Sequence, residues 1–152
     1  MKQILIAYHS QEKGNTRRMA ELVAEGCREV AGVEVTLINV NETRVDMALA
    51  ARADGYALGS PDYYSYMAGG LKQFFDDLCL ASWAGQPVTG KPYVAFLTHG
   101  GGGSAIASIE LLANAMKLIP AAPSVVCQGA PQGEAIAQSR QLGKALAEAV
   151  LR

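Results

Sequence analysis

Charge of one sign, long apolar runs and paired cysteines are all scarce in this sequence. Thirteen Lys and Arg stand against 14 Asp and Glu in 152 residues, a net charge of -1, which argues against nucleic acid or an anionic membrane as a partner. No apolar run approaches the roughly 20 residues that cross a bilayer, so no membrane span is expected. The three cysteines, Cys27, Cys79 and Cys127, lie far apart without a CxxC pair. This pattern is typical of reduced thiols and predicts a cytoplasmic protein.

Several catalytic and nucleotide-binding motifs are absent too. The sequence has no GxxxxGK[ST] loop for a nucleoside triphosphate and no GxGxxG for a dinucleotide. It has no GxSxG nucleophile elbow, so the stretch His99–Gly103 is not the oxyanion loop of an α/β-hydrolase. No CxxxxxR motif follows a cysteine, and the acidic residues of a receiver domain are replaced by Tyr8–Ser10 and Gly59–Ser60. We predict no metal site.

Short apolar runs alternate along the chain with segments whose apolar residues recur every three or four positions. The runs predict strands at 2–8, 33–40, 55–59, 91–98 and 122–128, and the periodic segments predict helices at 15–31, 45–52, 68–80, 104–118 and 132–151. This alternation predicts an α/β fold, a single doubly wound, three-layer domain over residues 1–152 with a five-stranded parallel sheet. The first residues, one lysine before a short apolar run, predict a strand rather than a signal peptide.

In a doubly wound sheet, ligands bind beyond the carboxyl ends of the strands, where three loops of this chain are expected. The first loop, Ser10–Thr16, joins a strand directly to a helix, so the free N–H groups of the first helical turn face the strand end. Ser10, Asn15 and Thr16 add side-chain donors there. Such neutral donors predict a site for a phosphate monoester, and the alternative is ordinary helix capping by Ser10 or Asn15.

The other two loops are rich in aromatic residues and in glycine. The loop 59–70 contains three of the six tyrosines, whose flat rings beside exposed backbone groups suit a planar heterocycle. The alternative for these tyrosines is a partner surface or a helix lid. The loop 98–104 has His99 followed by four glycines, which let a backbone approach a ligand closely. His99 is a candidate donor to a ligand carbonyl, or it caps the strand end, and His9 is predicted to be structural.

Two of these loops resemble those of the flavodoxin-like FMN-binding family. Gly14–Thr16 reads Gly-Asn-Thr and matches the end of that family's phosphate loop, Ser/Thr-x-x-Gly-Asn-Thr, with one extra residue after Ser10. The segment Gly59–Gly69 is similar to the NAD(P)H:quinone oxidoreductase branch, which typically reads Pro-x-x-Phe-Gly-x-Met-Ala-Gly. Tyr64 and Ser65 stand at its Phe and Gly positions. The resemblance covers nearly the whole chain and implies the flavodoxin-like strand order 2-1-3-4-5.

The resemblance also implies a cofactor site made of three groups of residues. The FMN phosphate would be held by Ser10, Gly14, Asn15 and Thr16. The isoalloxazine ring would be lined, largely through backbone groups, by Pro61, Asp62, Tyr63, Tyr64 and Ser65, and closed on the other side by Thr98, His99, Gly100, Gly101 and Gly102. Two departures from the family stand out. The extra residue leaves the contacts of residues 11–13 open, and Ser65 would be strained by ~1–2 kcal/mol at a positive φ.

With FMN carrying the electrons, two activities fit the sequence. The first is an NAD(P)H-dependent reductase of quinones or similar acceptors, favoured by the Met-Ala-Gly stretch and by a net charge too small to steer a protein partner. The second is a flavodoxin-type electron-transfer shuttle, favoured by the short chain and by an uninterrupted fifth strand around 123–127. A non-catalytic interaction module is the third alternative. We expect a small-molecule or protein electron donor and acceptor, and the aromatic loop is compatible with a homo-oligomer.

Overall fold

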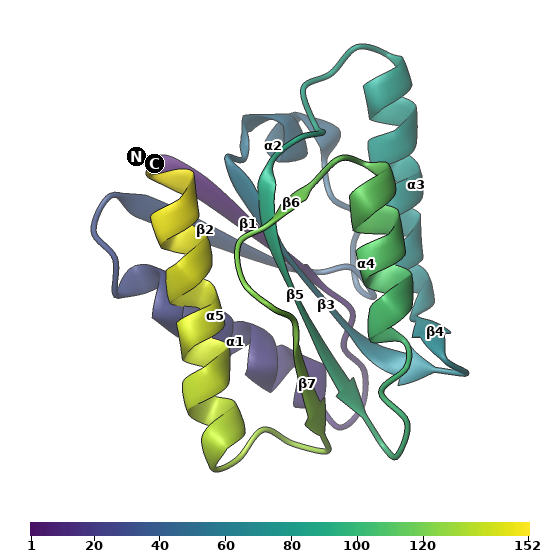
Figure 1. The fold of residues 1–152 in the computed structure, drawn as a ribbon. Helices are drawn as coiled ribbons and strands as arrows, with labels where there is room; N and C mark the ends of the chain where they lie inside the picture. Colours follow the sequence, from purple (N-terminus) through teal and green to yellow (C-terminus); the bar gives the residue numbers. More distant parts are fainter.

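The computed structural model describes all residues, 1–152, as a mostly parallel sheet with helices on both faces (Figure 1). The strands are β1 (Lys2–Tyr8), β2 (Val33–Asn39), β3 (Gly55–Tyr63), β4 (Tyr66–Met67), β5 (Pro92–His99), β6 (Ile119–Pro120) and β7 (Val125–Gln128). The helices are α1 (Asn15–Arg28), α2 (Met47–Arg52), α3 (Gly69–Trp83), α4 (Ile106–Ala115) and α5 (Glu134–Val150). None of these helices combines the length and the apolar character that a membrane crossing requires.

The strands follow the order β2-β1-β3-β5-β6, and β7 also pairs with β5. Every pairing along this path is parallel: Leu5 of β1 pairs with Thr36 of β2 on one side and with Tyr56 of β3 on the other. The short strand β4 pairs only with β3, in the antiparallel direction. The fourth and fifth predicted strands are therefore β5 and the β6–β7 edge, and the flavodoxin-like order 2-1-3-4-5 is confirmed.

Two apolar layers hold the sheet between its helices. Ile4 and Ile6 of β1 belong to the layer that packs against α1 and α5. Leu5 and Ala7 belong to the opposite layer, which packs against α2, α3 and α4. Because successive side chains of a strand point to opposite faces, an unbroken apolar run such as β1 fills both layers. This is why the central strands carry so few polar residues before their carboxyl ends.

Helices α1 and α5 approach each other closely because each brings a glycine to the contact. A Cβ atom on Gly26 would lie 1.8 Å from the carbonyl oxygen of Arg140, and one on Gly143 would lie 1.9 Å from that of Val23. No side chain fits at either glycine, so the two helix backbones touch. This contact fixes the direction of α1, whose N-terminus follows the end of β1 (Figure 1).

Strand β3 does not end at 59 as predicted but continues to Tyr63 and reverses into β4. Tyr64 and Ser65 form the two-residue turn, and both have positive φ, 56° and 64°. Two consecutive left-handed residues are typical of a type I′ turn, which strongly prefers Asn and Gly. The strained Ser65 that the sequence led us to expect is present, and Tyr64 shares its conformation. Neither residue type signals such a turn, so the hairpin was missed.

The fifth strand, predicted at 122–128 and uninterrupted around 123–127, begins only at Val125 as β7, and a separate two-residue strand, β6, precedes it. The sheet edge consists of β6 and β7, separated by residues 121–124. While β5 advances by three residues between its pairs with the edge, the edge chain advances by five, from Pro120 to Val125. Pro120 and Pro123 have no N–H to give to the ladder, so the extra residues leave it here. The interruption is short and contains no added helix or strand.

The helix boundaries differ slightly from those predicted. The helix predicted at 104–118 ends at Ala115, and the chain turns at Lys117, whose φ is 59°. The helix predicted at 132–151 begins at Glu134, and the helix predicted at 68–80 continues to Trp83. All other ends lie within three residues of the predicted ones. Local periodicity locates a helix well but its ends poorly.

Candidate functional site

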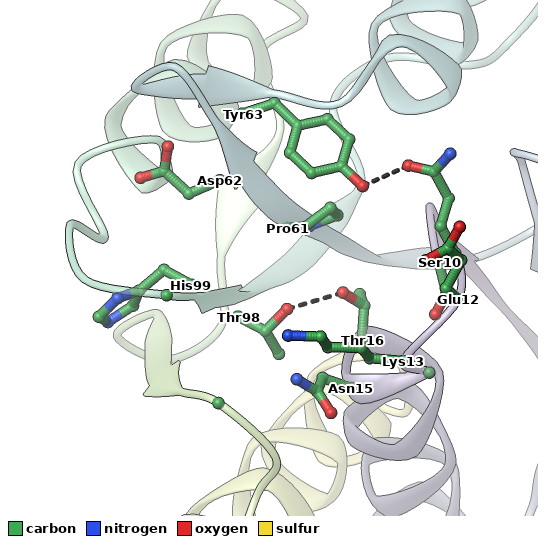
Figure 2. Close-up of a pocket in the computed structure, with 14 residues that line it drawn as sticks. Ser10, Glu12, Lys13, Asn15, Thr16, Pro61, Asp62, Tyr63, Thr98 and His99 are labelled. Carbon is green, nitrogen blue, oxygen red and sulfur yellow. Dashed lines mark hydrogen bonds between the residues drawn. The ribbon is translucent and has the colours of Figure 1, made fainter.

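The carboxyl ends of β1, β3 and β5 surround a polar cavity of about 480 Å³ that opens to solvent (Figure 2). Three segments build its wall: the loop after β1, the β3–β4 hairpin, and the glycine loop, which we define as residues 100–104. The lining residues are Ser10, Gln11, Glu12, Lys13, Gly14, Asn15, Thr16, Pro61, Asp62, Tyr63, Thr98, His99, Gly100 and Gly129. All three loops selected from the sequence therefore contribute to one cavity.

The loop after β1 wraps around the N-terminus of α1. Gly14 precedes the helix with φ 69°, a left-handed conformation that suits glycine, and provides no side-chain cap. The amides of Asn15 and Thr16 in the first turn take part in none of the loop hydrogen bonds. These N–H groups, together with the positive end of the helix dipole, make this part of the cavity wall an anion-binding surface.

Ser10 is held in place by Asn39, a residue that the sequence analysis missed. Asn39 ends β2, accepts a hydrogen bond from the Ser10 amide at 3.0 Å and donates one to the Ser10 carbonyl at 3.1 Å. The Ser10 hydroxyl oxygen then accepts from the amide of Arg17 at 3.1 Å. Ser10 thus acts partly as a helix cap, the alternative considered for it. Nothing local pointed to Asn39 because its contact joins two neighbouring parallel strands.

Thr16 of α1 and Thr98 of β5 meet at the base of the cavity. Their hydroxyl oxygens lie 2.8 Å apart, both residues are buried, and either hydroxyl can be the donor (Figure 2). A hydroxyl has one proton and two lone pairs, so the hydroxyl that accepts keeps its own proton for another partner. The pair therefore ties the first loop to β5 and leaves one O–H donor for a ligand.

Glu12 and Lys13 give the cavity wall one charge of each sign. Neither side chain forms an ion pair with another residue of the chain. In Figure 2 the Lys13 side chain lies beside Asn15 and Thr98, next to the start of α1. An ammonium in this position complements an anion bound at the helix N-terminus.

The opposite part of the wall carries an aromatic and an apolar side chain, Tyr63 and Pro61, on either side of Asp62. Tyr63 lies across the cavity from Thr98 in Figure 2, and its hydroxyl donates to the side-chain oxygen of Gln11. The Tyr63 ring also meets the His9 imidazole edge to face, with ring centroids 6.0 Å apart. Pro61 lies in the same strand, two residues earlier. Tyr63 thus connects the hairpin to the loop after β1.

Asp62 connects the same hairpin to the glycine loop. Its Oδ1 accepts from the Ser65 amide at 2.8 Å, and its Oδ2 accepts from the amides of Gly103 at 3.0 Å and Ala105 at 3.1 Å. Ala105 immediately precedes α4, so the carboxylate also lies at that helix N-terminus, where negative charge is stabilised. Amides from two separate loops therefore converge on one carboxylate.

The two histidines differ in their surroundings. His9 is buried outside the cavity wall; its Nδ1 accepts from the Gly70 amide at 3.1 Å, and its Nε2 has no partner. Burial lowers the pKa of His9, which favours the neutral imidazole that this acceptor role requires. Gly70 permits the contact because a Cβ atom there would lie 2.7 Å from Nδ1. His99 lines the cavity, and its Nδ1 is buried without a partner.

Ten of the fourteen cofactor contacts expected from the sequence line this cavity. The four that lie outside its wall are Tyr64, Ser65, Gly101 and Gly102. Tyr64 is fully exposed at the tip of the hairpin. Residues 11–13, left open by the extra residue in the loop, do line the cavity, and Gly129 was missed. Gly129 donates to the His99 carbonyl at 2.9 Å, a contact that exists only once the sheet has formed. No three His, Cys, Asp or Glu side chains gather around a point that could hold a metal ion.

The chain is similar in sequence and in fold to several known proteins. The model of the family described as NADPH-dependent FMN reductase matches residues 47–130. A flavodoxin from Aquifex aeolicus (strain VF5) is 40% identical, with 74% of this chain and 59% of the relative covered. An NAD(P)H dehydrogenase (quinone) from Geotalea uraniireducens (strain Rf4) is 34% identical, with 71% of this chain and 65% of the relative covered. A solved flavodoxin from the domain Archaea superposes with a TM-score of 0.85 and 25% identity over 99% of both chains.

These matches agree with the resemblance seen in the two loops. The chain covers less than two thirds of the length of the Aquifex and Geotalea relatives, 59% and 65%. The family match nevertheless covers more than half of the chain and includes both the hairpin and the glycine loop. The archaeal flavodoxin shares the fold from one end of the chain to the other. The chain therefore belongs to the NADPH-dependent FMN reductase family and is a flavodoxin-like flavoprotein.

Proposed function

We propose that residues 1–152 form one domain that binds FMN in the cavity at the carboxyl ends of β1, β3 and β5. The observation that carries this proposal is the division of the cavity wall into two parts. Amides without a partner and hydroxyl groups gather on the side of α1, whereas a tyrosine ring and a proline lie on the side of the hairpin. A phosphate monoester joined to a flat, largely apolar ring matches these two environments.

The residues of the cavity fit FMN in their chemistry. The volume of about 480 Å³ lies within the roughly 300–1,000 Å³ that small-molecule and cofactor sites occupy. The amides of Asn15 and Thr16 would donate to phosphate oxygens, the Thr16–Thr98 pair would add one hydroxyl, and Lys13 would balance charge. Hydrogen bonds to a charged group contribute ~1.5–3 kcal/mol each, so these donors favour FMN over riboflavin.

Bound FMN supplies the redox chemistry, receiving electrons from a donor and passing them to an acceptor. The residues of this chain bind and orient it. Tyr63 and Pro61 would border the ring, and His99 would donate to a ring carbonyl, one of the two roles considered for it. The bond from Tyr63 to Gln11 holds the aromatic side next to the phosphate side. Direct contacts by Tyr64, Ser65, Gly101 and Gly102 are not part of the proposal, because these residues lie outside the cavity wall.

For the activity, we propose NAD(P)H-dependent reduction of quinones or similar small acceptors. The family is described as NADPH-dependent FMN reductase, and one relative is an NAD(P)H dehydrogenase (quinone). The net charge of -1 gives little long-range attraction to a protein partner. The cavity opens to solvent, so a small donor or acceptor can reach the flavin without a docking protein.

A flavodoxin-type shuttle between protein partners is the second candidate. It is favoured by the flavodoxin from Aquifex aeolicus and by the archaeal flavodoxin, whose chain matches this one over 99% of its length. The sheet edge also supports it: only residues 121–124 separate β6 from β7, so no additional element is built at this edge.

Reconstitution with FMN, followed by anaerobic addition of NADPH or NADH, separates these candidates. Rapid direct bleaching of the flavin absorbance would support the reductase. A bound flavin that ignores both nucleotides but is reduced through a protein reductase would support the shuttle. A protein that binds no FMN would contradict both and leave the non-catalytic interaction module. We further propose that the chain forms a homo-oligomer, which sedimentation of the same sample tests. We also propose a cytoplasmic location, which is supported by the three separate, unpaired cysteines.

A further inference from the structure

We propose that Asp62 is a positioning residue that locks the β3–β4 hairpin and the glycine loop into one preformed wall for the ring of the cofactor. The lock is a property of the chain itself. Its effect on ligand binding rests on the proposed function, namely that FMN occupies this cavity.

The carboxylate of Asp62 accepts hydrogen bonds from three backbone amides in two parts of the chain. Its three amide partners lie 3, 41 and 43 residues away in sequence, at distances of 2.8 to 3.1 Å. A carboxylate only accepts hydrogen bonds and has room for about four of them, so it can satisfy all three amides at once. An asparagine in the same place could accept at one oxygen only and would turn an N–H₂ group toward the remaining amides.

The glycine loop has little else to order it. A Cβ atom at Gly100 or Gly101 would meet nothing within 4 Å, so the loop does not pack against its surroundings there. Four consecutive glycines also lose more backbone freedom on ordering than other residues do. Besides the bond of 3.0 Å from Gly103 to Asp62, the loop receives a hydrogen bond of 3.4 Å from Gln128 to the Gly100 carbonyl and one of 3.2 Å from the Ala107 amide to the Ser104 carbonyl. The bond to Asp62 is the shortest of these three, and it is the one that ties the loop to the hairpin.

The hairpin turn needs the same anchor for a different reason. Tyr64 and Ser65 both hold positive φ without being glycine, and such a conformation persists only where surrounding bonds enforce it. The bond from the Ser65 amide to Asp62 spans this turn. Asp62 thus holds both a strained turn and a flexible glycine loop. Both segments belong to the side of the cavity opposite α1.

This arrangement predicts that loss of the Asp62 carboxylate affects one half of the ligand only. A wall formed before binding spares the ligand the entropy cost of ordering it. The phosphate side is built from the N-terminus of α1 and shares no hydrogen bond with Asp62. FMN and riboflavin carry the same ring, so both should lose affinity by the same factor.

The first test uses the protein without ligand and follows amide hydrogen exchange by NMR. In the wild type we expect protection of the amides of Ser65, Gly103 and Ala105. In Asp62→Asn the amides that lose their acceptor oxygen should exchange at least about tenfold faster, because a hydrogen bond to a charged group contributes about 1.5–3 kcal/mol. Core amides such as that of Ile6 should stay protected, which shows that the variant is folded. Unchanged exchange at all three amides would overturn the proposal.

Two further variants keep this test interpretable. Glu12→Gln removes a carboxylate from the same cavity wall without removing any hydrogen bond within the chain, so the three amides should remain protected. Rapid exchange in Glu12→Gln would show that negative charge in the cavity, and not the Asp62 clamp, orders the loops. Asp62→Glu keeps the charge and the acceptors at a longer reach. It should restore part of the protection, and if Asp62→Asn does not fold, protection below wild type in Asp62→Glu with an intact core carries the test.

The second test compares the affinities of FMN and riboflavin by flavin fluorescence titration. Asp62→Asn should weaken both by the same factor, at least about tenfold. A loss confined to FMN would contradict the proposal, because Asp62 would then act on the phosphate side. If wild-type protein binds neither flavin, the proposed function fails while the exchange result still decides whether the lock exists. If the wild type binds FMN and Asp62→Asn binds it equally well, the inference fails and the proposed function stands.

Discussion

The two walls of the cavity are constructed differently. The phosphate wall, named for the group that it is proposed to hold, is one short stretch, Ser10–Thr16, placed at a helix N-terminus, and its donors are largely backbone amides. The ring wall, named for the flavin ring that it is proposed to border, combines the hairpin with a glycine loop some 40 residues away, and the side chain of Asp62 ties the two together. The backbone donors of the first wall are placed by the start of α1, and its loop is also held by the contacts of Ser10 with Asn39 and of Thr16 with Thr98. The second wall depends on a few individual hydrogen bonds.

This difference has a consequence for substitutions. A change in the phosphate wall should alter recognition of the phosphate alone and leave the fold intact, because α1 is held independently by its contact with α5. A change in the ring wall should alter local order as well as binding, because the loops there have few other contacts.

Thr16→Val in the phosphate wall should weaken FMN binding by about 1–3 kcal/mol, because a buried hydroxyl of the Thr16–Thr98 pair is lost at nearly constant volume. Riboflavin, which has no phosphate, should bind as to the wild type. Parallel fluorescence titrations with the two flavins measure both values, and Thr43→Val at an exposed position serves as the control. An equal loss for FMN and riboflavin would remove the distinction between the walls.

Ser65→Gly in the ring wall should raise the free energy of unfolding by about 1 kcal/mol, because glycine adopts φ 64° without the strain that a Cβ atom causes. Urea denaturation measures this change. Ser82→Gly places the same substitution inside α3 and should have the opposite sign. A destabilised Ser65→Gly protein would mean that the turn is not strained at this residue.

Tyr63→Phe should remove the one side-chain hydrogen bond that joins the two walls, from Tyr63 to Gln11. We expect the free energy of FMN binding to weaken by about 0.5–1.5 kcal/mol, the usual net contribution of one neutral hydrogen bond. Tyr66→Phe is a matched control, since Tyr66 is 40% exposed against 43% for Tyr63 and its hydroxyl has no hydrogen bond in the chain. Equal effects of the two variants would show that the bond to Gln11 contributes nothing.

The smallest effect concerns pH and the buried residue beneath the ring wall. The folded pKa of His9 lies below its ordinary value of 6.5 because the residue is buried. As the pH falls toward and below 6.5, His9 becomes protonated in the unfolded chain while it stays neutral in the folded chain. The free energy of unfolding should therefore fall as pH decreases, by at most about 0.7 kcal/mol between pH 7 and pH 6. About one pH unit above 6.5 and higher, both states are neutral at this residue, and its contribution should be constant.

His9→Asn is the matching variant, because Asn Oδ1 can still accept from the Gly70 amide and does not titrate. Urea denaturation of the two proteins at several pH values should give a flatter profile for His9→Asn between pH 7 and pH 6. Parallel profiles for the two proteins would show that His9 is not responsible for the pH dependence.

Much of the fold could be predicted from the sequence because it depends on local patterns. β1 and β5 are unbroken apolar runs, and the strand–loop–helix at Ser10–Thr16 has hydroxyl, amide and glycine residues in a recognisable order. The hairpin and the interrupted sheet edge could not be predicted. The hairpin depends on Tyr64 and Ser65, which adopt conformations unusual for their residue types. The interruption of the edge depends on the pairing with β5, which advances three residues where the edge chain advances five.

The same division applies to the site. The stretch Ser10–Thr16 was predicted to lie at the site because its residues are contiguous, and it does line the cavity; that it holds a phosphate stays a prediction. Asn39 and Gly129 were missed because each acts through a hydrogen bond between strands. Asp62 was correctly placed at the cavity, but its role toward Gly103 and Ala105 involves residues far away in sequence. Long-range hydrogen bonds leave no periodic signal, so the structure was needed to find them.

The most direct measurement is a fluorescence titration of the wild-type protein with FMN and, in parallel, with riboflavin. A cavity with a phosphate wall and a ring wall should bind FMN more tightly than riboflavin by at least about tenfold, because the donors around α1 act on the phosphate alone. Binding of neither flavin, or equal affinity for the two, would contradict the assignment of the cavity as an FMN site.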